Sequence, residues 1–105
     1  MVTSLNTVLE KTAHVLGYQS AIDFTRIELR NQVAQKLAYF KGRASVYEQK
    51  YNMSLDEFMQ RVPNQQDADL KQFGIIEKED DSMDWEDSQH SFVFYQQQLA
   101  QLIDE

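Results

Sequence analysis

The stretch "SAIDFTRIELRNQVAQKLAYFKGRASVYEQKY", residues 20–51, decides the fold because its apolar side chains recur at the spacing of one helix face. Ser20 suits a helix start, since its hydroxyl can accept a hydrogen bond from a free backbone amide. An unbroken helix of these 32 residues spans about 48 Å, whereas a compact globule of 105 residues has a diameter of about 33 Å. The apolar positions are Ile22, Leu29, Val33, Leu37, Phe40, Ala44, Tyr47 and Tyr51.

The long helix must therefore either break at Gly42 or belong to an elongated protein. A glycine inside a helix lowers its stability by only about 1 kcal/mol relative to alanine, so the helix can continue unbroken through Gly42. An elongated protomer leaves the apolar stripe without cover from its own chain. We therefore favour an elongated helical protomer with one long helix, in which residues 1–53 form a helical-bundle or coiled-coil-like homodimer.

Two shorter helices are predicted on either side of the long one. The first runs from Thr3 to Leu16, with apolar residues at three- and four-residue spacing, and Gly17 ends it. The second begins after Ser54 in "MSLDEF", where Glu57 three residues later completes a capping box. Met53 and Phe58 on either side of that cap form a hydrophobic staple. Pro63 ends this helix at Val62, because proline disfavours helical geometry in the residue before it.

A final amphipathic helix is predicted from Ser82 or Met83 to Ile103, with Trp85, Phe92 and Leu99 along one line. Before it, residues 67–73 suit two short helical turns. The segment "GIIEKEDD", residues 74–81, is expected to be a loop or a short extended piece, with both isoleucines against the core. The chain is thus predicted to be a single all-α domain, residues 1–105.

The net charge of −7 is divided unequally between the two halves of the chain. Residues 1–53 carry seven Lys or Arg and four Asp or Glu, whereas residues 54–105 carry three and thirteen. The second half, at −10, is a poor match for nucleic acid, whose phosphates it repels. It suits a basic protein, because complementary potentials accelerate encounter. The dispersed basic residues of the first half allow at most weak contact with nucleic acid.

Composition also bears on compartment and chemistry. Cys is absent, the first residues lack the basic and apolar regions of a signal peptide, and no apolar run approaches about 18 residues. We expect a cytoplasmic protein that does not span a membrane. The two histidines, His14 and His90, have no metal-ligand spacing, and the acidic run 79–87 lacks the glycine and alternation of a calcium loop. No nucleophile, phosphate loop or paired carboxylates can be argued for, so we expect neither enzyme, metal nor cofactor.

The only tryptophan, Trp85, lies among carboxylates in "DDSMDWED", residues 80–87. One interpretation makes it an ordinary core anchor of a helical bundle, with the acids capping the last helix. The other makes it the anchor of a partner contact, since Trp and Tyr dominate binding hot spots and carboxylates can orient a basic protein.

The stretch from Tyr47 to Leu102 resembles small prokaryotic antitoxins of the TumA-like kind. The resemblance lies in "YEQKYNMSLDEF", residues 47–58, and in the "DD…DWED" element, residues 80–87, that opens the last helix. It implies a type II antitoxin whose N-terminal helices dimerise and whose acidic C-terminal helix covers the basic surface of an RNA-degrading toxin. The contact residues it implies are Asp84, Trp85, Glu86, Phe92 and Tyr95.

We therefore expect a non-enzymatic protein that neutralises a co-expressed basic toxin through residues 54–105. The alternative is a self-contained helical homodimer with a scaffolding or assembly role.

Overall fold

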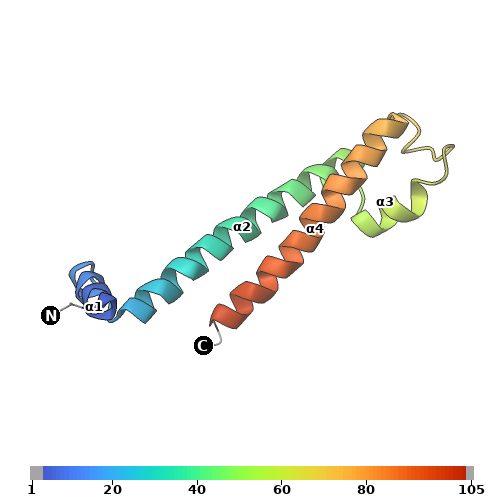
Figure 1. Cartoon of the computed structure of the whole chain (residues 1–105). Coiled ribbons are helices and arrows are strands. Elements are labelled where there is room, and N and C mark those ends of the chain that lie inside the picture. Colours follow the sequence, from blue (N-terminus) through green and yellow to red (C-terminus); the bar gives the residue numbers. More distant parts are fainter. Residues whose placement is uncertain (1–3, 104–105) are drawn as a thin grey trace.

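The computed structural model describes residues 4–103 and consists, over that range, of four α-helices without a β-strand. The helices are α1 (Leu5–Val15), α2 (Ala21–Tyr51), α3 (Leu55–Arg61) and α4 (Ile75–Ile103) (Figure 1). The predicted all-α class is confirmed.

The long helix α2 is unbroken. Ser20 caps its start, because its Oγ accepts a hydrogen bond from the amide of Asp23 at 2.9 Å. Its end is set by Asn52, whose φ of 55° is a left-handed conformation that Asn adopts more readily than most residues. Gly42 lies inside this helix, and no other side chain lies within 4 Å of where its Cβ would be. The helix therefore continues through Gly42 without a break. The chain measures 75 × 25 × 17 Å, and the predicted elongation is confirmed.

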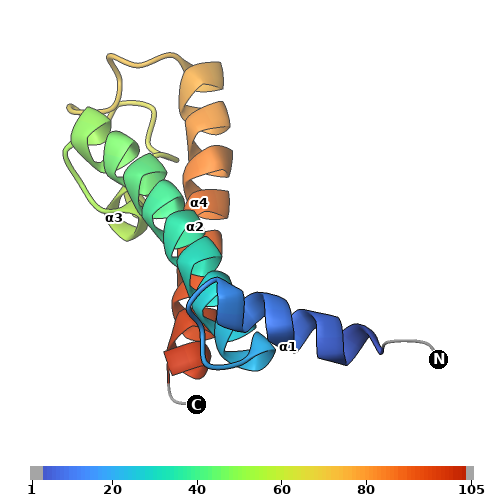
Figure 2. The ribbon, with the colours of Figure 1, turned by 90° about the vertical axis from the view of Figure 1, so that its left-hand side faces the viewer.

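Helix α4 returns antiparallel to α2, and the two form a helical hairpin whose last residues lie near the start of α2 (Figures 1 and 2). The seam between them is lined by aromatic rings at intervals. Phe40 of α2 stacks on Tyr95 of α4, with 5.8 Å between ring centroids and 7° between ring planes. A pair of helices covers only one face of each, so the remaining faces of both helices meet solvent.

Helix α1 projects from the open end of this hairpin (Figure 2). Ser4 caps it by accepting the amide of Thr7, and only Ala13 on it is buried. The predicted start at Thr3 lies outside the described residues. Glu10 fixes the connection to the next helix, because its carboxylate accepts the amide of Ala21 at 3.1 Å. The aliphatic residues of α1 are largely exposed, with Leu5 at 70%, Val8 at 47%, Leu9 at 46% and Val15 at 78%.

Helix α3 begins as the capping box predicts, with Ser54 Oγ accepting the amide of Glu57 at 3.2 Å. The carboxylate of Glu57 turns instead to Arg61, at 3.3 Å. Met53 and Phe58 are both buried, in agreement with a hydrophobic staple. Residues 62–73 then form a series of turns rather than regular helix.

The prediction for the start of the last helix was wrong. α4 begins at Ile75, seven residues before the predicted Ser82, and the segment expected to be a loop is its first two turns. Ile75 and Ile76 are 65% and 72% exposed rather than packed on the core. The Glu77 carboxylate accepts the amide of Gly74 at 3.2 Å and so satisfies a free donor ahead of the helix. Consequently most of the acidic run lies inside the helix and not at its N-terminal cap.

The core occupies one end of the molecule, where α3 and the following turns close over the α2–α4 hairpin (Figure 1). Trp85 is fully buried at its centre. Its ring lies 5.9 Å from Tyr47, 6.0 Å from Tyr51 and 5.3 Å from Phe58, between ring centroids. The other members of the cluster are Ala44, Met53 and Leu70, with Leu55, Val62 and Phe73 partly buried around them.

Replacing Trp85 by Ala should lower the free energy of unfolding by about 3–5 kcal/mol, because it removes the largest core side chain and leaves a cavity. Met83→Ala on the same helix is the control. Met83 is 61% exposed, so its truncation should change stability by only about 0.5 kcal/mol. Urea unfolding followed by circular dichroism measures both. Equal stability of the two variants would contradict the core role of Trp85.

Candidate partner-binding surface

The five residues predicted to contact a partner all lie on α4, but the structure directs most of them toward their own chain. Trp85 is a core residue, which agrees with the first interpretation of it given above and leaves it no exposed surface in this conformation. Its indole N–H has no hydrogen-bond partner among residues 4–103, so packing alone holds the ring. Phe92 and Tyr95 are half-buried in the α2–α4 seam, where Tyr95 stacks on Phe40. Glu86 is also half-buried.

Asp84 is held by two side chains of α2. It accepts hydrogen bonds from the hydroxyl of Tyr47 and the guanidinium of Arg43. The hydrogen bond from Tyr47, assisted by Arg43, lowers the pKa of Asp84 below its ordinary value. The same hydrogen bond, together with burial, raises the pKa of Tyr47. The carboxylate of Asp84 is therefore satisfied internally.

A second cluster repeats this arrangement two turns further toward the end of α2. Lys50 on α2 lies 2.6 Å from both Glu77 and Asp81, and Tyr51 donates to Asp81 at 2.5 Å. Lys50 lowers the pKa of Glu77, with help from the Gly74 amide. Burial raises the pKa of Tyr51, and its bond to Asp81 raises it further. The inner carboxylates of α4 thus fasten this helix to α2.

Sequence reasoning missed these pairs because it treated the basic residues of the first half as a dispersed, solvated set. A signal was present. The seven-residue step from Arg43 to Lys50 on α2 equals the step from Asp84 back to Glu77 on α4. Equal steps of opposite charge are what an antiparallel pair of helices needs to bring both pairs into register.

A third ion cluster closes the turn after α3. Arg61 binds Asp67 with two nitrogens, at 2.8 and 2.9 Å, and also contacts Asp69 at 2.5 Å. The guanidinium lowers the pKa of Asp67 to about 2. Two backbone amides, of Asp69 and Leu70, donate to the same carboxylate. This cluster has a structural role, since it holds the turns over the core.

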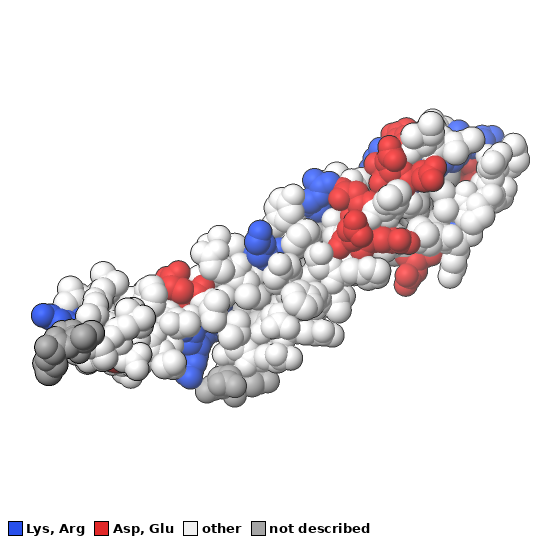
Figure 3. Space-filling view, in the orientation of Figure 1, with Lys and Arg blue, Asp and Glu red and all other residues white. Residues whose placement is uncertain are grey.

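A different set of carboxylates remains on the outward side of α4. Glu79, Asp80 and Asp87 are exposed, and no basic nitrogen of residues 4–103 lies within 4.0 Å of them or of Glu86. Figure 3 shows acidic side chains gathered over the first half of α4, at the end of the molecule that holds the core. This outer acidic set is the unneutralised charge that α4 offers to solvent.

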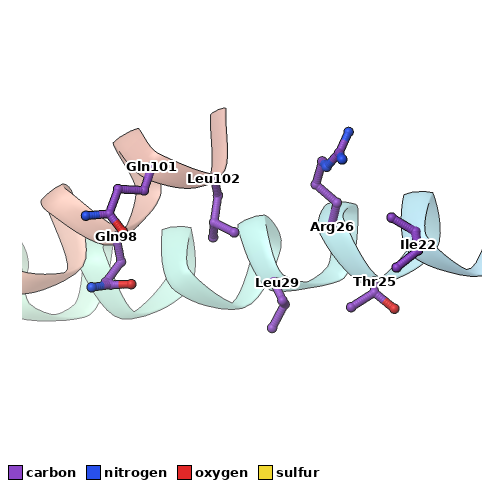
Figure 4. A pocket seen from close by; sticks show the side chains of 7 residues that line it. All are labelled: Ile22, Thr25, Arg26, Leu29, Gln98, Gln101 and Leu102. Atoms are coloured by element: carbon purple, nitrogen blue, oxygen red, sulfur yellow. The ribbon is translucent and has the colours of Figure 1, made fainter. Parts of the chain in front are cut away.

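At the opposite end, a groove of about 320 Å³ lies between the first turns of α2 and the last turns of α4 (Figure 4). Its walls are mainly aliphatic and amide side chains without paired titratable groups. The residues lining it are Ile22, Thr25, Arg26, Leu29, Gln98, Gln101 and Leu102.

Neither a metal site nor a membrane span is found in the described part of the chain. Over residues 4–103, no three His, Asp or Glu side chains are grouped as a metal ion would require. No helix in the same range is both long and apolar enough to cross a bilayer.

The fold and surface define an elongated all-α chain with one acidic and one apolar end. A comparison with known proteins finds no match among family models, curated proteins or solved structures.

Acid should destabilise the fold. The folded-state pKa values of Asp67, Glu77 and Asp84 lie below their unfolded values of about 4, so their stabilisation is complete above about pH 5 and is lost as the pH falls toward 2. Thermal unfolding by circular dichroism between pH 2 and 8 should show a falling Tm. Asp67→Asn should flatten this dependence, whereas Asp56→Asn, at an exposed residue without an ion pair among residues 4–103, should not. A Tm that is constant between pH 6 and 2.5 would contradict the role of these pairs.

Proposed function

We propose that this chain is a non-enzymatic, antitoxin-like protein that binds and neutralises a basic protein partner, a toxin of the RNase kind, through the acidic half of α4. The observation that carries the proposal is the division of carboxylates on that helix. The inner ones are neutralised by α2, whereas Glu79, Asp80 and Asp87 face solvent without a cation from residues 4–103. These outer carboxylates make no ion pair that holds α4 on α2, so the fold does not depend on them.

Electrostatics supports a basic partner over other classes. Unpaired carboxylates attract a positive surface and repel phosphate, so they favour a protein whose own ligand is a polyanion such as RNA. The resemblance of residues 47–102 to TumA-like antitoxins points to the same class of partner.

The alternative is a self-contained helical homodimer with a scaffolding or assembly role. The burial of Trp85 against its own chain favours it, because such a protein needs its aromatic residues for its own core. Both functions share one feature, a dimer built on the apolar end of the molecule.

The surface area supports that dimer. The chain exposes 7787 Å², whereas a compact protein of 12.3 kDa exposes about 6,100 Å². The excess is larger than the roughly 800 Å² that each partner buries in a standard interface. Exposed aliphatic residues lie toward the apolar end of the molecule, on α1, at the start of α2 and at the end of α4. They are Leu5 (70%), Leu9 (46%), Leu16 (61%), Ile22 (67%), Leu29 (49%) and Ile103 (59%).

The partner proposal predicts salt-sensitive binding to a short basic protein encoded in a neighbouring reading frame. Affinity should fall as salt rises, because ions screen the outer carboxylates. Asp80→Asn/Asp87→Asn should weaken binding about tenfold at low salt. The control Glu48→Gln/Asp56→Asn removes the same charge elsewhere and should have a smaller effect. Calorimetry at two salt concentrations measures both. Absence of a basic neighbour, of binding, or of any difference between the two variants would contradict the proposal.

The dimer proposal predicts a mass twice 12.3 kDa in size-exclusion chromatography with light scattering. Leu9→Glu/Leu16→Glu should give a monomer, because two charges are then placed in an apolar interface. Val46→Glu, at a residue that is 61% exposed on the middle of α2, should leave the dimer intact. A monomeric wild-type chain would refute the dimer.

A further inference from the structure

Helix α4 carries a second apolar stripe on the side away from α2. Ile76, Met83 and Phe94 are 72%, 61% and 53% exposed. At 100° per residue they fall within an arc of about 20°, and they extend over about 27 Å of the helix. We call these three residues, with Glu79, Asp80 and Asp87, the outer strip.

The rotation of α4 about its axis keeps the outer strip away from the core. Trp85 lies about 180° from Ile76 on the helix wheel, and its burial among Tyr47, Tyr51 and Phe58 fixes that rotation. The ion pairs of Lys50 with Glu77 and Asp81 hold the same side of the helix on α2. The strip cannot turn inward unless these contacts break.

Carboxylates accompany the apolar residues along this strip. Asp87 lies between Met83 and Phe94 along the helix and about 20° from Phe94 around its axis, whereas Glu79 and Asp80 flank the apolar residues on either side. All three acids are exposed, and none has a basic nitrogen of residues 4–103 within 4.0 Å. An exposed face that combines three large apolar side chains with unpaired charge of one sign is typical of an interaction surface.

We infer that the outer strip is the part of α4 that enters the partner, lying in an apolar groove on a basic protein with lysine or arginine side chains at its rim. The inference rests on the proposed function and deepens it. Phe94 and Met83 supply buried area, Ile76 extends the contact toward the helix start, and the three carboxylates meet the basic rim. This is the helix-in-groove mode, with anchors about two and three turns apart.

A second copy of this chain fits the strip poorly. A twofold contact places the same patch on both subunits, so the carboxylates of two strips would face each other. Like charges brought together across an interface weaken it. The apolar end of the molecule, where exposed aliphatic residues have few acids among them, suits self-association better.

Four of the five contact residues predicted from the sequence then act from the α2 side of α4, whereas Glu86 lies about 80° from Ile76, at the edge of the outer strip. Asp84 and Trp85 orient the helix through their bonds and packing with α2. Phe92 and Tyr95 line its seam. They are positioning residues for the outer strip, and their removal should weaken binding only as far as it loosens the hairpin.

The test compares two double variants against the basic protein of the neighbouring reading frame. Met83→Ser/Phe94→Ser removes two anchors of the strip, whereas Tyr39→Ser/Val46→Ser removes apolar side chains that are 58% and 61% exposed on α2. Calorimetry should show a Kd raised by about 10- to 100-fold for the first pair and within about twofold of wild type for the second. Circular dichroism verifies that both variants keep the helix content of the wild type.

Each outcome separates the two proposals. Failure of the wild-type chain to bind overturns the proposed function and the inference with it. Wild-type binding with equal affinities for the two double variants overturns the inference alone. A change in oligomeric state on Met83→Ser/Phe94→Ser assigns the strip to a second copy and also overturns it. Should the first pair unfold, Met83→Gln, a polar change at one exposed site, replaces it and should still weaken binding severalfold.

Discussion

The packing of Trp85 against the rings of Tyr47, Tyr51 and Phe58 is the contact on which the rest of the structure depends. It joins α2, α3 and α4 at one point and fixes both the position of α4 along α2 and its rotation. Because the hairpin has only two helices over most of its length, no second core can correct an error at this junction. The orientation of the exposed side of α4 therefore follows from the burial of one side chain.

The charges of α4 follow the same division. The inner carboxylates of Glu77, Asp81 and Asp84 pair with Arg43 and Lys50, so the charge on that side of α4 is neutralised within the chain. These pairs are partly exposed, so solvent screens them and each adds little to stability. Their main effect is on alignment, because a one-turn slip of α4 would separate Arg43 from Asp84 and leave Lys50 with only one of its two carboxylates. The exposed carboxylates of α4 without a cation among residues 4–103, Glu79, Asp80 and Asp87, therefore lie on its outward side.

Sequence reasoning could predict the long helix, because its apolar period is continuous. It could also predict the elongated shape, because the length of that helix exceeds the diameter of a compact globule. It could also predict the Ser54 cap, which depends on residues close in sequence. It failed at the start of α4, where Glu77 and Asp81, four residues apart, repel each other in an isolated helix. Lys50 lies between the two carboxylates in the folded chain and converts this repulsion into attraction. That compensation comes from a residue distant in sequence, so local patterns could not reveal it.

The same limit explains the assignment of Trp85. Along the sequence, a tryptophan among carboxylates is easily taken for an exposed residue, because its immediate neighbours are charged. On a helix, however, Asp84 and Glu86 point about 100° to either side of Trp85, and a core partner can fill the gap between them. The periodicity of α4 contained two apolar sides, and only the side with the larger aromatic rings was recognised as a stripe. The weaker side, with Ile76, Met83 and Phe94, stayed hidden because acids interrupt it, although those acids are what make it suitable for a basic partner.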